Sequence, residues 1–392
     1  MTDDIVIVAA KRTPMGGMAG ALSGVATPEL GATAIRAALE ASGVSAEAVD
    51  EVMMGCVLPA GLGQAPARQA ALGAGLPEGT PCSTLNKVCG SGMKTTMLAN
   101  DLLKAGGINV AIAGGMENMS RAPYMLPQAR QGMRMGHGQV MDHMLLDGLE
   151  DAYGGGLMGV LAQKTANQYG LTREDMDAFA ISSVKRAQAA VESGAFDAET
   201  AAVTVKGRKG DTRVDADEAP FKANIDKIPS LRPAFAKDGT ITAANASSIS
   251  DGAAALVLMR ASDAKAQSLK PLARIASHAT HARKPEEFTI APIGAIEKAL
   301  QKAQWTTRDV DLFEINEAFA MVTMLAQQEL ELDPETVNVN GGACALGHPI
   351  GASGARIIVT LLHALKARGK TRGLASLCIG GGEATAMTVE LL

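Results

Sequence analysis

Two short patterns occur once in each half of the chain, and together they constrain the fold more than any other feature of the sequence. Ser-Gly opens a segment of helical spacing at residues 91–94 and again at residues 353–356. Later in each half, a strand-like run ends in Gly-Gly and is followed shortly by a glutamate, Glu117 in one half and Glu383 in the other. We interpret this echo as an internal duplication. Two such halves would pack with pseudo-twofold symmetry and bring their matching turns together at the junction.

Apolar strand-like runs alternate with amphipathic helical patterns in both halves. The expected strands lie at residues 5–10, 108–113, 272–276 and 312–315, and the expected helices at residues 27–39, 91–105, 293–303 and 317–330. Alternation of this kind predicts an α/β fold, in which helices cover both faces of a sheet.

Length and charge narrow the class of protein. A chain of 392 residues exceeds one ordinary core, so two similar domains, or two plus an insertion, are expected. The net charge of −5 and the lack of a lysine or arginine block argue against nucleic acid as the main partner. No run approaches the roughly 18 apolar residues of a membrane span. The acidic start, residues 1–4, is unlike a targeting peptide, so we expect a cytoplasmic protein that binds no membrane.

The segment between the halves, from about residue 120 to 244, differs in composition. It is rich in methionine, glycine and proline, and its one long expected helix runs from a capping box at Thr172 to Gly194. Such a long insertion in an α/β protein is typical of a functional lid. We expect it to provide substrate specificity and subunit contacts.

Two of the five cysteines lie in glycine-rich turns. Cys89 precedes Gly-Ser-Gly and an expected helix, and Cys378 is followed by Ile-Gly-Gly-Gly. A helix N-terminus with free N–H groups favours thiolate, so Cys89 is a candidate nucleophile; the ordinary alternative is a small buried side chain. Cys56, Cys82 and Cys344 are interpreted as structural. With no Cys-x-x-Cys spacing, we expect free thiols and no metal.

His348 and Asn316 are the other candidates for chemistry. His348 stands between Gly347 and Pro349, in a turn without an apolar face. A neutral imidazole there could take a proton from Cys89 and then donate to an oxyanion, whereas the ordinary alternative is solvent exposure. Asn316 follows an expected strand and would, on its own, be interpreted as the N-cap of the next helix.

Together these segments resemble the thiolase family over residues 5–392. The motifs that carry the resemblance are the turn around Cys89, Asn-Glu-Ala-Phe-Ala at 316–320, Gly-His-Pro-Ile-Gly at 347–351 and the glycine run after Cys378. The resemblance implies two related layered α/β halves with a loop domain inserted in the first. We therefore expect one half at residues 1–120 plus 245–268, the loop domain at 121–244 and the second half at 269–392.

The resemblance also implies a mechanism with coenzyme A thioesters as substrates and no separate cofactor. Cys89, with His348 as its base, would take an acetyl group from acetyl-CoA and release CoA. Cys378 would then remove a proton from a second acetyl-CoA, and the carbanion would attack acetylated Cys89 to give acetoacetyl-CoA. His348 and a water held by Asn316 would stabilise the enolate oxygen. The backbone N–H groups of Cys89 and Gly380 would hold the tetrahedral oxyanion.

Further positions match residues that the family places near its substrate. Ser247 matches a pantetheine contact, and four other residues match the lining of the tunnel: Met158, Phe235, Ala318 and Phe319. Leu157 stands where a histidine often precedes the Met-Gly pair, which leaves the acyl-chain preference open. A loop-domain arginine found near the nucleotide end in some members is absent, and Lys222 is the residue that could replace it.

Several functions stay open at this point. Acetyl-CoA C-acetyltransferase activity leads, because residues 133–151 look more like the short-chain group, and a degradative 3-ketoacyl-CoA thiolase is the nearest alternative. A decarboxylating ketoacyl synthase uses a second histidine where Cys378 stands. The alternative outside enzymology is a lipid- or CoA-binding module that has lost the chemistry. The family implies a homo-oligomer, with a tetramer favoured over a dimer.

Overall fold

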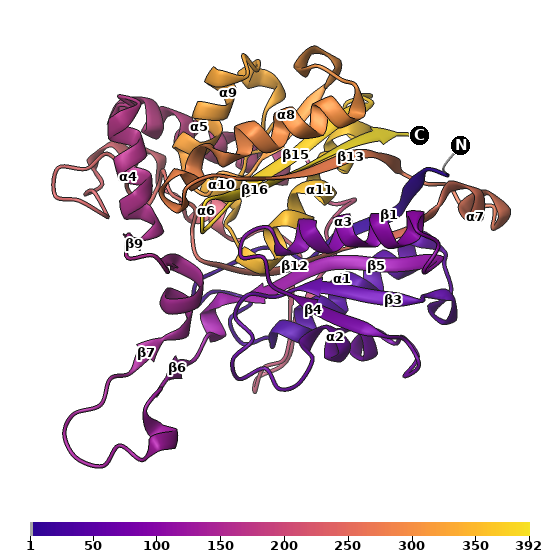
Figure 1. Cartoon of the computed structure of the whole chain (residues 1–392), viewed down its shortest axis with the longest axis horizontal. Helices are drawn as coiled ribbons and strands as arrows, with labels where there is room; N and C mark the ends of the chain where they lie inside the picture. The colour runs from indigo at the N-terminus through magenta and orange to yellow at the C-terminus, as the bar shows by residue number, and fades with distance from the viewer. Residues whose placement is uncertain (1–2) are drawn as a thin grey trace.

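One large mixed sheet runs through the protein, of which the computed structural model describes residues 3–392 (Figure 1). Its ten strands follow the order β14-β15-β16-β13-β1-β12-β5-β3-β4, with β2 beside β12. The first-half strands are β1 (Ile5–Arg12), β2 (Gly16–Gly17), β3 (Glu51–Gly55), β4 (Cys82–Leu85), β5 (Val110–Asn118) and β12 (Ser250–Arg260). The second-half strands are β13 (Ala273–Ala282), β14 (Leu312–Ile315), β15 (Arg372–Ile379) and β16 (Glu383–Leu391).

The two halves of this sheet share one topology. Counted along the chain from β1 and without the two-residue β2, the first-half strands have the spatial order first, fifth, fourth, second, third. The second half has the same order from β13, with a parallel bridge from Phe313 to Val337 in place of a third strand. The first two pairings in each half are antiparallel and the rest are parallel. The expected α/β class and duplication are therefore confirmed, and β1 pairs with β13 where the halves meet.

The helices of the two halves complete a layered arrangement. They are α1 (Thr27–Ser42), α2 (Pro66–Ala74), α3 (Ser91–Lys104), α7 (Ala261–Ala266), α8 (Ala291–Ala303), α9 (Ala320–Glu329), α10 (Ala343–Leu346) and α11 (Ile350–Ala367). The apolar side chains of α3 and α11 share one core with strands of both halves. Helices α1 and α2 cover the other face of the first-half strands, and α8 covers that of the second-half strands (Figure 1).

The repeated Ser-Gly pattern has a packing reason. A Cβ atom on Gly354 would lie 2.5 Å from the backbone N of Met93, and one on Gly92 would lie 2.8 Å from the backbone N of Ala355. The first turns of α3 and α11 therefore meet backbone to backbone, which only glycine permits. Helix α11 has the length and mean hydropathy of a membrane span, but 83% of it is buried, so its hydropathy is that of a central core helix.

The inserted segment forms three helices, α4 (Met158–Gln168), α5 (Arg173–Glu192) and α6 (Ala219–Lys222). It also forms three short strand pairs: β6 (Tyr124–Met125) with β7 (Met141–Asp142), β8 (Glu150–Asp151) with β9 (Gly156–Leu157), and β10 (Val203–Val205) with β11 (Thr212–Val214). The expected start of α5 is confirmed, because the Thr172 side chain accepts a hydrogen bond from the backbone N of Asp175 at 3.1 Å. Helix α4 has no counterpart among the expected elements, and no side chain caps its start. The three domain boundaries stay a prediction.

One expected helix begins later than predicted. Helix α9 starts at Ala320 with Phe319 as its N-cap, so the start expected at Glu317 and the N-cap role of Asn316 were wrong. The backbone N of Asn316 instead continues the sheet by donating to Ser376 O at 3.0 Å. The Glu317 carboxylate accepts hydrogen bonds from Ser183, Asn338 and the backbone of Cys344. These tertiary contacts hold residues 316–319 out of the helix.

Candidate active site

Cys89 lies in a strained turn between β4 and α3. The preceding residue, Val88, has φ +46°, which is a costly conformation for a β-branched side chain. Two hydrogen-bonding side chains hold the turn: Asn86 Oδ1 accepts from the backbone N of Val88 at 2.8 Å, and Ser91 Oγ donates to Val88 O at 2.6 Å. Cys89 therefore stands in a fixed position one residue before Gly90, the N-cap of α3.

The second cysteine approaches this turn from the other half. Cys378 lies near the end of β15, and the β15–β16 connection turns through Gly381 and Gly382, with φ +90° and +89°. A Cβ atom on Gly90 would lie 2.4 Å from Cδ1 of Ile379, so the glycine lets the two halves meet closely. An ion pair between Lys87 and Glu383 also crosses the junction. The matching turns therefore converge as the duplication predicted.

Burial sets the protonation state of both thiols. It raises the pKa of Cys89 to about 11, although the backbone N–H groups of Gly380 and Cys89 oppose that rise. The pKa of Cys378 is also raised, first by burial and then by the nearby charge of ionised Cys89. The N–H groups favour the thiolate, as the sequence suggests, but the loss of hydration outweighs them. Both cysteines are thiols near neutral pH, so Cys89 needs a base.

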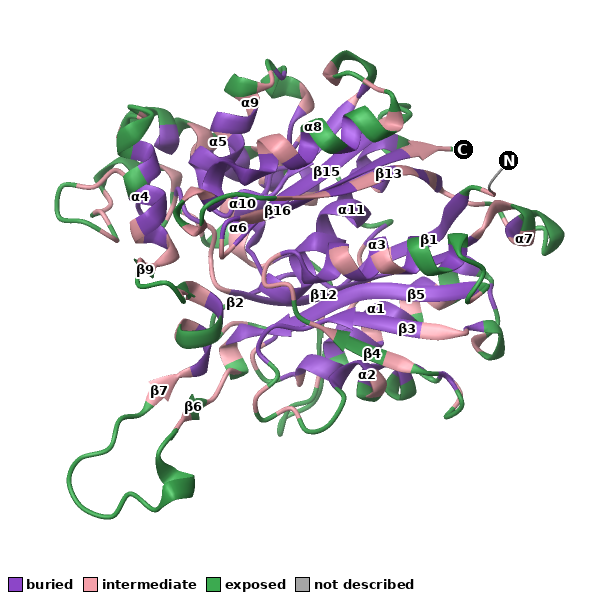
Figure 2. Cartoon of the chain, in the orientation of Figure 1, coloured by how far each residue is buried: buried purple, intermediate pink, exposed green. Residues whose placement is uncertain are grey.

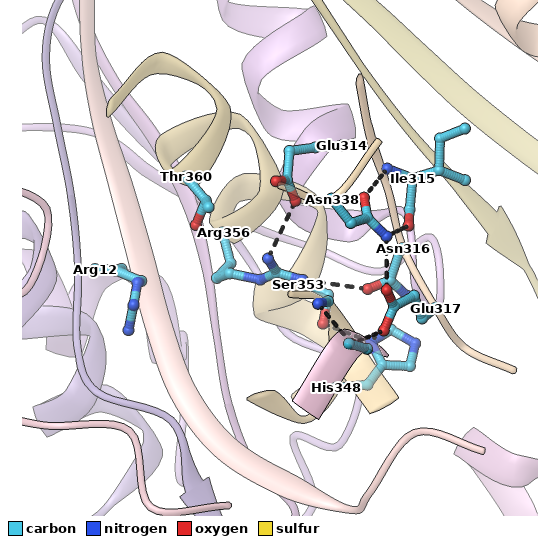
Figure 3. Close-up of polar contacts among 12 residues, drawn as sticks. Arg12, Glu314, Ile315, Asn316, Glu317, Asn338, His348, Ser353, Arg356 and Thr360 are labelled. Carbon is cyan, nitrogen blue, oxygen red and sulfur yellow. Dashed lines mark hydrogen bonds and ion pairs between the residues drawn. The ribbon is translucent and has the colours of Figure 1, made fainter. Parts of the chain in front are cut away.

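His348 lines the same cavity and is buried. Only 6% of it is exposed, which excludes the solvent-exposed alternative. Its Nδ1 lies 2.5 Å from Ser353 Oγ, which in turn lies 2.9 Å from Pro349 O (Figure 3). A carbonyl only accepts, so the Ser353 hydroxyl donates to Pro349 O, and its oxygen accepts a hydrogen bond from the protonated Nδ1 of His348. That assignment leaves Nε2 unprotonated, and Nε2 has no hydrogen-bond partner within residues 3–392.

The charge state of His348 suits the role of a base. Burial, followed by the positive charge of Arg356, lowers the pKa of His348 to about 3. The imidazole is therefore neutral at physiological pH, with a free lone pair on Nε2. A neutral, correctly tautomeric imidazole is what proton abstraction from a thiol requires.

Asn316 lies beside His348 and not on the cavity wall. It is buried, and its Nδ2 is 3.5 Å from His348 Nδ1 while its Oδ1 is 3.5 Å from Nη2 of Arg356 (Figure 3). Asn316 is thus beside the histidine, but Nδ1 already donates to Ser353, so the amide makes no hydrogen bond to it. Its role in holding a water stays a prediction.

An apolar cavity of about 440 Å³ joins these groups. Ten of the residues singled out by sequence line it: Cys89, Leu157, Met158, Phe235, Ser247, Ala318, Phe319, His348, Cys378 and Gly380. Lys222 is not brought to the cavity. It is exposed on α6 and pairs with Glu218, so its expected position near a substrate has no support from the fold.

Other parts of the site were not found from sequence. Apolar side chains from short helical turns and from the start of α11 close the cavity, among them Leu145, Leu149, Phe288 and Ile350. The sequence could have pointed to Ile350, because it lies two residues after His348. The other three are ordinary apolar residues that no motif marks. Ser353 and Arg356 were quoted within a motif and given no role, because their contacts with His348 and Asn316 arise only in the folded chain.

Two of the remaining cysteines, Cys56 and Cys344, lie beside glutamates. All five are free, as predicted. Cys344 Sγ contacts Glu317 O at 3.7 Å, and Cys56 Sγ lies 3.6 Å from the buried Glu117 carboxylate. Burial raises the pKa of both thiols, and the neighbouring glutamates raise it further. Neither thiol is activated.

Two family profiles account for nearly the whole chain. Residues 5–262 match the profile described as "Thiolase, N-terminal domain", and residues 269–391 match "Thiolase, C-terminal domain". The chain belongs to the thiolase family. This thiolase is 52% identical to an acetyl-CoA acetyltransferase of Pseudomonas aeruginosa, over 98% of this chain and 99% of the relative. It is 53% identical to one of Escherichia coli strain K12, over 99% of each chain.

A solved structure gives the same result for the fold. The crystal structure of the Bacillus anthracis acetyl-CoA acetyltransferase matches this thiolase with a TM-score of 0.97 and 42% sequence identity. The match covers 100% of this chain and 99% of the other. The fold expected from the motifs is therefore confirmed over its full length.

Proposed function

We propose that this thiolase is an acetyl-CoA C-acetyltransferase, which condenses two acetyl-CoA molecules to acetoacetyl-CoA and CoA and also runs in reverse. The observation that carries the proposal is the convergence of two thiols and a neutral imidazole on one apolar cavity. Full-length relatives named acetyl-CoA acetyltransferase, at about half identity, support it.

In the first stage, Nε2 of His348 takes the proton of Cys89, and the sulfur attacks the carbonyl carbon of acetyl-CoA. The backbone N–H groups of Cys89 and Gly380 stabilise the oxyanion, and such donors are typically worth roughly 3 kcal/mol each. The C–S bond to CoA then breaks. Because the pKa of Cys378 is raised, this thiol is protonated at rest and gives its proton to the departing CoA sulfur.

In the second stage, the Cys378 thiolate left by that step removes a proton from the methyl carbon of a second acetyl-CoA. The His348 imidazolium and a water held by Asn316 stabilise the enolate oxygen. The carbanion attacks the acetyl carbon on Cys89, and the Cys89 sulfur leaves and recovers its proton from His348. Cys378 ends as a thiol, so the protons balance over the cycle.

The cavity wall fits the narrow apolar arm and acyl group of a CoA thioester, which is a substrate here and not a resident cofactor. Ser247, Met158 and Phe235 contact the pantetheine in this proposal, and Ala318 and Phe319 line the same wall. Leu157 adds an apolar side chain, so it influences which acyl chain fits. Lys222 stays a proposed contact to the nucleotide end only if that end extends over α6.

We also propose that the chain forms a homo-oligomer, with a tetramer favoured over a dimer, in the cytoplasm. The arm between β6 and β7, residues 126–140, supports this proposal of an oligomer. Apolar side chains on the arm, such as Met133 and Met135, are exposed. Five free thiols fit a reducing compartment. We propose no nucleic-acid or membrane partner.

The test is CoA-dependent thiolysis of acetoacetyl-CoA beside a medium-chain 3-ketoacyl-CoA, with Cys89→Ala as the blank. We expect a clear preference for acetoacetyl-CoA and loss of turnover in the blank. Equal or faster turnover of the longer substrate would make the protein a degradative 3-ketoacyl-CoA thiolase. No turnover of either, with Cys89 inert to acetyl-CoA, would leave a CoA- or lipid-binding module.

A further inference from the structure

A fully buried arginine lies behind the proposed catalytic groups. Arg356 of α11 has no solvent exposure, and its Nη1 is 3.6 Å from Oε2 of Glu314, at the end of β14. Neither residue lines the described cavity. An isolated buried ion pair is often no more stabilising than well-packed apolar residues, so stability alone is a weak reason for a guanidinium at this position.

The surrounding charges leave Arg356 with few partners. Arg12, the other buried arginine, donates to Glu199 at 2.5 Å and binds both carboxylate oxygens of Asp217 at 2.7 and 2.8 Å. Glu199 also accepts from the Thr360 hydroxyl at 3.0 Å, one turn beyond Arg356 on α11. Among the described residues, the groups that contact Arg356 are Glu314 and Asn316 (Figure 3).

The contact with Asn316 fixes how that amide points. An asparagine side chain has an oxygen and an NH₂ group of nearly the same shape, and rotation about its last bond exchanges them. A guanidinium can only donate, so Nη2 of Arg356, 3.5 Å away, faces the oxygen Oδ1. The NH₂ group then lies beside His348, with Nδ2 3.5 Å from the imidazole Nδ1. Since Nδ1 already gives its hydrogen bond to Ser353, this contact is not a hydrogen bond, and the NH₂ group keeps its protons for another acceptor. The reversed amide would place two donors against each other at Arg356.

We propose that Arg356, held by Glu314, is a positioning residue that orients the Asn316 amide so that its NH₂ group serves the reacting oxygen beside His348. The inference rests on the proposed function, in which Asn316 helps to stabilise the enolate. Arg356 touches no substrate in this arrangement and acts through Asn316.

The test is a double-mutant cycle between Arg356→Met and Asn316→Ala, measured as kcat and KM for acetoacetyl-CoA thiolysis. Arg356→Met lowers kcat at least tenfold and leaves KM within twofold, because Arg356 does not contact the thioester. In the Asn316→Ala background, the same substitution lowers kcat less than threefold, since there is no amide left to orient. Thr360→Val, at a buried site on the same helix, is the control and lowers kcat less than twofold in both backgrounds.

Additive losses in the cycle would overturn the proposal, and so would an equal loss in Thr360→Val. If Arg356→Met does not fold, Arg356→Lys replaces it. A lysine keeps the charge opposite Glu314 but lacks the planar fork that reaches two acceptors at once. We expect a fivefold or greater fall in kcat that again disappears in the Asn316→Ala background, and full kcat in Arg356→Lys would contradict the proposal.

A second measurement separates this inference from the proposed function. The rate of Cys89 alkylation by iodoacetamide, followed by mass spectrometry in the same variants, needs no CoA substrate. If the wild type turns over no thioester, the proposed function fails. A non-additive effect of Arg356 and Asn316 on alkylation would still support the positioning role, and an additive effect would overturn it.

Discussion

At the level of single residues, the site pairs an uncharged thiol with an uncharged imidazole. The pKa of Cys89 is raised to about 11 and that of His348 is lowered to about 3, both chiefly by burial. The thiolate fraction of Cys89 therefore rises about tenfold per pH unit well below that pKa. We expect the alkylation of Cys89 by iodoacetamide, followed by mass spectrometry, to accelerate steadily from pH 7 to pH 9. A rate that is flat over this range would instead indicate a thiolate–imidazolium pair at rest.

Gly90 is the residue on which the approach of the two halves depends. Because a Cβ atom there would lie 2.4 Å from Cδ1 of Ile379, Gly90→Ala should displace the end of β15 and with it Cys378 and Gly380. We expect kcat for thiolysis to fall at least tenfold. Gly90→Ala combined with Ile379→Val removes the clashing methyl group and should recover part of the loss. A Gly90→Ala variant with wild-type kcat would show that the junction tolerates the added atom.

Sequence reasoning identified residues whose chemistry is visible locally. Cys89, His348 and Cys378 stand in glycine-rich turns, and the structure brings all three to one cavity. Arg356 and Glu117 were noted only as members of the repeated patterns, and their roles could not be found in this way. Each works through partners far away in sequence, and a buried charge leaves no periodic signature.

At the level of elements, the crossing of α3 and α11 decides whether the two halves can pack. A Cβ atom on Gly354 would lie 2.5 Å from the backbone N of Met93, which cannot move aside as a side chain can. We expect Gly354→Ala to lower the unfolding free energy by about 1–3 kcal/mol, the usual cost of overpacking. Urea unfolding followed by circular dichroism measures it. Gly79→Ala is the matched control, because nothing lies within 4 Å of its added Cβ, and equal destabilisation by both changes would contradict the argument.

The start of α9 shows where local patterns stop being informative. Residues 316–319 were included in an expected helix, yet they lie outside it because Glu317 binds Ser183, Asn338 and Cys344. The strand at Leu312–Ile315 was predicted with its observed bounds, and all four of its residues are buried, the charged Glu314 included. Periodicity therefore located the elements, and tertiary hydrogen bonds moved their ends.

At the level of the whole molecule, Glu117 links the two halves through a buried carboxylate. It accepts hydrogen bonds from the backbone N of Val57 and Leu58 in the first half and of Gly351 in the second. Burial outweighs these donors and raises its pKa from the ordinary 4.5 to about 7. A raised pKa means that the folded state binds the proton more tightly, so the stability contributed by protonated Glu117 is complete below about pH 4.5 and is lost as pH rises through about 7.

We therefore expect the Tm of the wild type to fall between pH 5 and pH 8 by more than that of Glu117→Gln, which cannot titrate. Differential scanning fluorimetry at several pH values measures both. Glutamine loses one acceptor oxygen, so the variant should also be less stable at every pH. Parallel curves for the two proteins would mean that Glu117 does not titrate in this range.

The arm between β6 and β7 belongs to the scale of the assembly. It stands away from the body of the protein, and its apolar residues are exposed, with Met135 98% accessible and Leu126, Met133 and Val140 partly so (Figure 2). Exposed apolar groups gathered on one projection are typical of a contact between proteins. Replacing these four residues by serine should reduce the proposed tetramer to dimers in light scattering coupled to gel filtration. Arg134→Gln, on the same arm, is the control and should keep the wild-type mass, whereas an unchanged mass in the serine variant would assign the contact to another surface.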